Sequence, residues 1–153
     1  MSLEDKFARL QAAAGKLNDA TDGFNETIEA VEDRLERIGV GLTYWLDGPK
    51  HIFAQEQDSR AQAIAGKALG YAKLDEGWCL AVKSVVFTDD GTRVLNTTQK
   101  PVALLKAGRL TRVEAARQLE PLIEALAAYA ESLVNGVEAA RRAVATAIKT
   151  DAS

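Results

Sequence analysis

The stretch LEDKFARLQAAAGKLNDATDGFNETIEAVEDRLERI, residues 3–38, decides the fold of this chain. Its apolar side chains recur at gaps that alternate between four and three residues, which is the heptad spacing of a helix with one apolar seam. The pattern predicts one unbroken helix, about 50 Å long at 1.5 Å per residue, that ends at Gly39 and Gly41. Polar residues flank the seam closely, so its narrow width favours packing against one helical partner over burial in a broad core. The seam positions are Leu3, Phe7, Leu10, Ala14, Leu17, Thr21, Phe24, Ile28, Val31, Leu35 and Ile38, and only Thr21 is polar.

The segment after this helix has the pattern of an antiparallel sheet. Apolar side chains alternate from Val40 to Leu46 and predict one strand. The β-rich runs 69–74 and 78–87 flank a short loop that contains Gly77, which predicts a hairpin. A short strand is expected at residues 93–95. Residues 50–65 have no clear period: their first part fits an extra strand, and a mobile stretch is expected near residues 55–62.

The last third of the chain has a helical pattern. A short helix is expected between Pro101 and Gly108, and a capping box at residues 111–114 predicts that a second helix starts at about Arg112. Pro121 is expected to kink or restart this helix. Beyond it, apolar residues again alternate at gaps of three and four, which predicts a long helix that pairs antiparallel with the first one.

Together these patterns predict a fold of the α+β class. Its expected order is a long N-terminal helix, a three- to four-stranded antiparallel sheet, a short helix, and a long kinked C-terminal helix that pairs with the first. The 153 residues are enough for one hydrophobic core, so we expect a single domain over residues 1–153. Its expected parts are a helix at 1–39, a sheet at 40–98 and helices at 99–150.

The composition is that of an ordinary folded protein, with 47% apolar and 27% charged residues. The only cysteine, Cys79, excludes an internal disulfide framework and is compatible with a reducing compartment. No apolar stretch approaches the roughly 20 residues that a membrane span requires. The N-terminus lacks the basic-then-apolar order of a signal peptide. We therefore expect a cytoplasmic protein.

One short basic segment lies in a chain whose net charge is −3. Residues 99–118 carry five basic side chains against Glu114 alone. Among them, Lys106, Arg109 and Arg112 lie at the start of a predicted helix, whose N-terminus favours anions, so a phosphate-bearing ligand is one interpretation. The simpler interpretation is that these residues pair with the acidic first helix. Nucleic acid is disfavoured because the pI is about 5.3.

Residue types that carry catalysis are sparse. The only histidine, His51, falls in a predicted turn and is expected to be exposed, while Cys79 on a predicted strand is expected to be inert packing. One histidine and one cysteine far apart cannot form a zinc site on their own. Gly66-Lys67 lacks the other residues of a phosphate loop, so Gly66 and Gly70 are expected at strand bulges or where the backbone is approached closely. The sequence therefore predicts no enzyme, no metal site and no cofactor.

These observations favour a non-catalytic protein–protein interaction or assembly module that self-associates as a homodimer. Two helices paired on one face of the sheet leave the other face open, and an open apolar face usually marks an interface. The alternatives are that residues 50–65 fold over that face, or that both seams are satisfied within one chain. A second class of function is a small-ligand or anion-sensing domain that uses the basic segment around Arg109. The expected interface residues are Cys79, Ala81, Val85, Phe87 and Tyr129.

Overall fold

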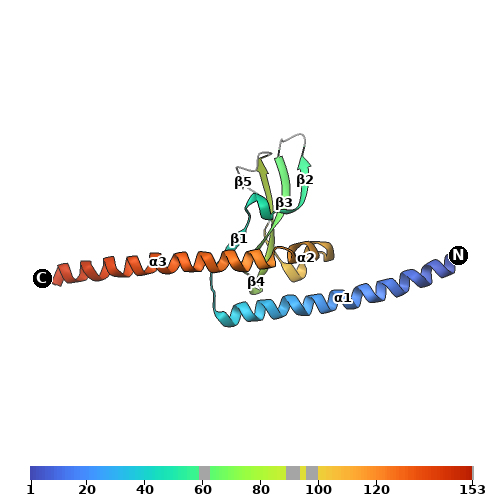
Figure 1. Ribbon diagram of the computed structural model, residues 1–153, viewed down its shortest axis with the longest axis horizontal. Helices are drawn as coiled ribbons and strands as arrows, with labels where there is room; N and C mark the ends of the chain where they lie inside the picture. Colours follow the sequence, from blue (N-terminus) through green and yellow to red (C-terminus); the bar gives the residue numbers. More distant parts are fainter. Residues whose placement is uncertain (59–62, 89–93, 96–99, 153) are drawn as a thin grey trace.

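The computed structural model describes residues 1–58, 63–88, 94–95 and 100–152, and it has the predicted order of a long helix, an antiparallel sheet, a short helix and a long helix (Figure 1). The fold is of the α+β class. The helices are α1 (Leu3–Ile38), α2 (Arg109–Ala116) and α3 (Leu119–Ala152), with 3-10 turns η1 (Pro49–His51) and η2 (Leu104–Lys106). The strands are β1 (Tyr44–Leu46), β2 (Phe53–Asp58), β3 (Ala63–Leu74), β4 (Gly77–Thr88), β5 (Val94–Leu95) and β6 (Val102–Ala103).

Helix α1 is unbroken over 36 residues, as its heptad pattern predicted. It begins with a capping box in which the Ser2 hydroxyl accepts from the Asp5 amide and the Asp5 carboxylate accepts from the Ser2 amide. It ends at Gly39, whose φ of 72° is the left-handed conformation that glycine adopts without steric cost. Both ends of the helix are therefore fixed by local sequence.

The sheet is an antiparallel meander in which the six strands of the described residues occupy four positions. β3 and β4 form the predicted hairpin, with Ala63 opposite Thr88 at one end and Leu74 opposite Gly77 at the other. β1 and β2 both pair with β3, so they form one outer position that η1 interrupts. β5 and β6 both pair with β4 and form the other. The four positions agree with the predicted three to four strands.

The helices cover the face of the hairpin that carries Leu69, Tyr71 and Leu80. These side chains are at most 1% exposed and pack in one cluster with the buried parts of α1, α2 and α3. The predicted alternation along residues 40–46 is confirmed, because its apolar side chains join the same cluster. The carboxylate of Glu32 on α1 accepts a hydrogen bond from the backbone amide of Leu80 at 3.2 Å.

The opposite face of the hairpin is lined by small residues and is covered by side chains of the same chain. The Trp45 ring occupies the space that a side chain at position 70 would need, since a Cβ on Gly70 would lie 2.2 Å from Trp45 Cε3. A Cβ on Gly66 would likewise lie 2.3 Å from Ile52 Cγ2. The expected close approach at both glycines is thus confirmed. Lys83 lies over the Trp45 ring, 4.8 Å from its centroid.

This closure means that the prediction of an open sheet face was wrong. All four sheet residues expected at an interface are buried within one chain: Cys79, Ala81, Val85 and Phe87 are at most 5% exposed. The physical reason is the small size of the β3 residues on this face, which lets Trp45 and Ile52 from the outer strands lie flat against the sheet. The rival expectation, that part of residues 50–65 folds over this face, is met by Ile52.

The predicted antiparallel pairing of the two long helices is also wrong. In Figure 1 both helices run in the same direction across the strands, with the N-terminus at one end of the molecule and the C-terminus at the other. The reason is that α2 carries the chain back before α3 begins. The helix break falls at residues 117–118, so Pro121 lies in the first turn of α3, where its missing N–H removes no helical bond.

Two smaller expectations differ from the structure. Helix α2 begins at Arg109 after Gly108, three residues before the predicted capping box would start it. The hydroxyl of Thr111 accepts instead from Lys67 Nζ at 3.2 Å, which ties α2 to the sheet. Of the stretch expected to be mobile, the part before residue 59 is strand β2, and residues 59–62 lie outside the described residues.

We predict that Gly70→Ala destabilises the fold by about 1–3 kcal/mol, because the new methyl group overlaps the Trp45 ring and the neighbouring backbone. Gly48→Ala is the matched control, since Gly48 has a φ of −64° and nothing within 4 Å of the position of a Cβ. Urea unfolding of both variants measures the difference. Equal stability of the two variants would contradict the covered sheet face.

We predict that Glu32→Gln leaves the free energy of unfolding at pH 7 unchanged or higher. Burial raises the pKa of Glu32 above its usual 4.5, while the hydrogen bond from Leu80 opposes the shift. The ionised carboxylate is therefore less favourable in the folded chain than in the unfolded chain. The glutamine keeps an acceptor for Leu80 without the charge. Its advantage over the wild type should shrink as the pH falls through the Glu32 pKa. Glu32→Ala, which removes the acceptor, should cost about 1 kcal/mol in the same urea titrations.

Candidate interaction surface

The first 15 residues of α1, residues 3–17, extend past the rest of the molecule (Figure 1). We call this segment the α1 arm. Every residue in it is exposed, including its large seam side chains. The exposed fractions are 68% for Leu3, 60% for Phe7, 63% for Leu10 and 49% for Leu17.

The end of α3, residues 134–150, extends in the opposite direction, and we call it the α3 arm (Figure 1). Every residue in it is exposed as well. Leu133 is half-buried and marks the boundary of the body. The large apolar side chains of the arm are Val134, Val137, Val144 and Ile148, with exposed fractions of 58–65%.

In α1 the exposed seam continues a buried one. Ile28 and Leu35 are 3% and 6% exposed and pack on the sheet, and the same heptad phase runs on to Leu3 without a break. A seam that is buried along one half of a helix and bare along the other is suited to bind a further helix. The sequence analysis missed the arms as a site. The available signal was the length of the heptad pattern, which exceeds the width of a four-stranded sheet.

Lys106, Arg109 and Arg112, the candidate anion-binding residues, do not converge on one site in the structure. Lys106 pairs with Glu76, and Arg109 donates to Asn18 Oδ1 on α1 at 3.0 Å. Arg112 donates to the carbonyl oxygens of Leu105 and Ala107. Of these three residues, Arg109 contacts the first helix as the simpler interpretation expected. Its partner there is the side-chain amide of Asn18 and not a carboxylate.

A different group of basic side chains lines a shallow cleft of about 330 Å³ beside the start of α2. It contains Lys67, Lys83, Lys100 and Lys106. Lys67 donates to Thr111, Lys83 pairs with Asp47 at 3.0 Å, and Lys106 pairs with Glu76. Most of this positive charge is therefore already engaged by side chains of the chain itself.

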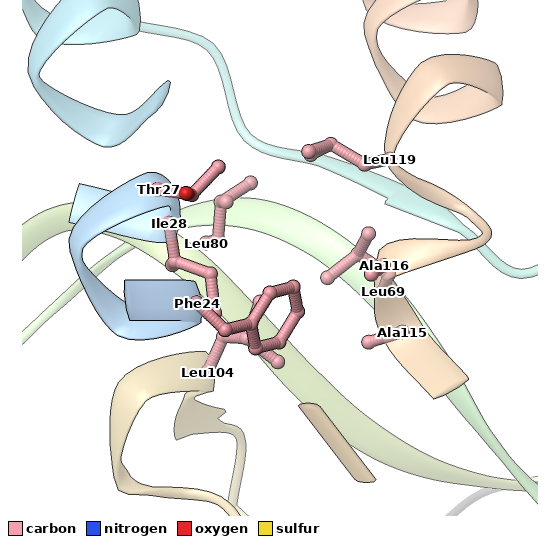
Figure 2. Close-up of a pocket in the computed structure, with 9 residues that line it drawn as sticks. All are labelled: Phe24, Thr27, Ile28, Leu69, Leu80, Leu104, Ala115, Ala116 and Leu119. Atoms are coloured by element: carbon pink, nitrogen blue, oxygen red, sulfur yellow. The ribbon is translucent and has the colours of Figure 1, made fainter. Parts of the chain in front are cut away.

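A small cavity lies where α1, α2 and α3 meet the sheet (Figure 2). Its volume is about 30 Å³. A water needs about 10–15 Å³ of such space, so the cavity has room for one or two waters and for no organic ligand. Its lining is apolar apart from Thr27, and the residues are Phe24, Thr27, Ile28, Leu69, Leu80, Leu104, Ala115, Ala116 and Leu119.

The two residues with catalytic potential have structural partners. His51 is half-buried, and not exposed as predicted, because its Nδ1 lies 3.1 Å from Gln118 Oε1 and joins η1 to the turn before α3. Burial, with a smaller contribution from Glu32, raises the pKa of the Cys79 thiol to about 11. Nowhere among the described residues do three or more His, Cys, Asp or Glu side chains gather in a way that could hold a metal ion.

Comparison with known proteins gives no match, whether to a family model, to a curated protein or to a solved structure. In the described part of the chain, no helix has both the length and the apolar character needed to cross a membrane. The assignment of function therefore depends on the surfaces themselves.

We predict that Cys79 resists thiol reagents in the folded protein. With a pKa of about 11, roughly one thiol in 1,000 is ionised at pH 8, and the side chain is also 5% exposed. Labelling by an aromatic disulfide should be at least about 100-fold slower in buffer than in urea, with Cys79→Ser as the unlabelled control. Rapid labelling of the folded chain at pH 8 would show an accessible thiolate and would restore the case for an enzyme.

Proposed function

We propose that the chain is a non-catalytic assembly module that self-associates by coiled-coil pairing of its α1 and α3 arms. The single observation that carries this proposal is the unbroken heptad seam of α1, buried at Ile28 and Leu35 and bare at Leu3, Phe7 and Leu10. The sheet residues expected at an interface are already covered, and Tyr129 packs against Tyr44 with ring centroids 5.4 Å apart. Most of the exposed large apolar side chains of the long helices are on the arms, and the others are Ile38, Ile123 and Tyr129.

The energetics of burying the arms are in the range of reversible association. Full burial of a Val, Leu, Ile or Phe side chain stabilises by about 1.5–3 kcal/mol. The eight large arm side chains are about half exposed, so pairing two arms gains roughly 6–12 kcal/mol. Loss of translational and rotational freedom costs about 4–15 kcal/mol. The gain and the cost are of similar size, so the proposed assembly depends on concentration, and a homodimer is its smallest form.

A second copy of the chain fits the arms because each copy supplies two exposed apolar helix surfaces, one on the α1 arm and one on the α3 arm. Isolated helices of this length are marginal in water, so arms of 15–17 residues gain stability from a helical partner. This role requires no cofactor, and we place it in the cytoplasm, where the free Cys79 stays reduced. A different protein with a matching seam could use the same surface.

The alternative function, anion sensing, has one observation in its favour. The cleft beside the start of α2 gathers four lysines, and within the described residues Lys67 donates to a hydroxyl and pairs with no carboxylate. The engagement of Lys83 and Lys106 by Asp47 and Glu76 makes this the weaker proposal. A shift in melting temperature with inorganic phosphate would support it.

We predict that the mass of the full chain in solution exceeds 16.5 kDa and rises with concentration. Two variants should abolish this: the α1-blocked variant carries Phe7→Asp and Leu10→Asp together with an intact α3 arm, and the α3-blocked variant carries Val137→Asp and Val144→Asp together with an intact α1 arm. Each replaces exposed seam side chains by charges. Light scattering from about 1 to 500 μM measures the mass.

The matched control carries Ala8→Asp and Ala12→Asp, which add the same charge to exposed positions of the α1 arm outside the seam. It should associate like the wild type. Circular dichroism and thermal melts verify that all variants keep the folded body. A wild-type mass of 16.5 kDa at every concentration would contradict self-association.

A further inference from the structure

The two arms leave the body at opposite ends of the molecule, and both helices run in the same direction (Figure 1). The α1 arm therefore cannot meet the α3 arm of its own chain. A second copy shifted along the long axis of the molecule brings its α3 arm beside the α1 arm of the first. In that position the two arms are parallel, which is also the relation of α1 and α3 within the body.

The arms match in length and in the spacing of their seams. At 1.5 Å per residue, the α1 arm is about 22 Å long and the α3 arm about 26 Å. Leu3 and Leu17 at the ends of the α1 seam are about four helical turns apart, and so are Val134 and Ile148, the first and last large apolar residues of the α3 arm. A parallel pair thus places Leu3 near Val134 of the next copy and Leu17 near Ile148.

The side chains of the two seams are also complementary in size. The α1 arm presents Leu and Phe, whereas the α3 arm presents Val and Ile separated by Ala140 and Ala147. Large side chains facing small ones let two helices approach closely and interdigitate. Pairing of two α1 arms would set Leu and Phe mainly against each other, and pairing of two α3 arms would set Val, Ile and Ala against each other.

We propose that copies of this chain assemble head to tail, with the α1 arm of each copy bound in parallel to the α3 arm of the next. The assembly then keeps one free α1 arm at one end and one free α3 arm at the other. A contact between different surfaces that repeats by translation does not close, so the assembly grows as a linear chain. This inference rests on the proposed self-association and specifies its partner, direction and symmetry.

Two other arrangements compete with this one. In like-with-like pairing, α1 arms bind each other and α3 arms bind each other across twofold axes. In a closed twofold dimer, each α1 arm binds the other chain's α3 arm in the antiparallel direction.

The test mixes the α1-blocked and α3-blocked variants of the full chain. Head-to-tail pairing requires one intact arm of each kind. Each variant alone should therefore remain at 16.5 kDa, and a 1:1 mixture should form a species of about twice that mass that grows no further. The wild type should instead increase in mass continuously with concentration. Sedimentation velocity distinguishes these species.

The direction of the pair is tested by disulfide trapping in the Cys79→Ser background, where only introduced cysteines are present. The α3-blocked chain carries Leu17→Cys on its intact α1 arm. The α1-blocked chain carries either Ile148→Cys or Val134→Cys on its intact α3 arm. Parallel pairing should give at least about tenfold more cross-linked dimer with Ile148→Cys than with Val134→Cys.

Each other outcome overturns the head-to-tail chain in an identifiable way. Dimers of either blocked variant alone would establish like-with-like pairing, and self-association would stand. A wild-type mass that stops at twice that of the chain at all concentrations would establish the closed dimer. Preferential cross-linking to Val134→Cys would establish antiparallel arms. A monomeric wild type would remove both this inference and the proposed function.

Discussion

The packing of α1 across the β3–β4 hairpin is the contact on which the rest of the structure depends. Ile28 and Leu35 fix the helix on the sheet, and Glu32 satisfies the Leu80 amide beside them. Strands lie about 4.8 Å apart, so a sheet of four positions is roughly 20 Å wide. Helix α1 has 36 residues and α3 has 34, so each is about 50 Å long. Both cross the strands of the sheet (Figure 1). Neither helix can bury its whole seam on this sheet.

The opposite face of the sheet determines where the remaining apolar surface lies. Because Gly66, Ala68 and Gly70 on β3 have small side chains or none, Trp45 and Ile52 can lie close to the strand and cover that face. The chain therefore needs no second layer of helices, and the sheet offers no broad apolar face to a partner. Most of the apolar surface that stays open along the two long helices is on the arms, which is why the assembly hypothesis moves from the sheet to the helix ends.

Local patterns in the sequence predicted the elements that depend on local physics. The heptad spacing gave α1 to its exact ends, and the loop at Gly77 gave the hairpin. The direction of α3 relative to α1 could not be predicted in this way, because a heptad pattern fixes the phase of a seam and not the orientation of its partner. Glycine and alanine alternate at positions 66, 68, 70 and 72, and this was the available sign of a covered face. The pattern indicates that space lies above the strand, but it does not predict which side chains fill that space.

The arms also contain a feature that bears on the affinity of the proposed pairing. Each holds one helical glycine, Gly15 and Gly136, and nothing lies within 4 Å of the position of a Cβ at either. A glycine inside a helix costs about 1 kcal/mol relative to alanine, and no contact within the chain requires it here. An unpaired arm is therefore a weakened helix, and part of the free energy of pairing is used to order it. In the proposed assembly this coupling would lower the affinity of each contact while leaving the body folded, so the assembly would be reversible and would respond to concentration.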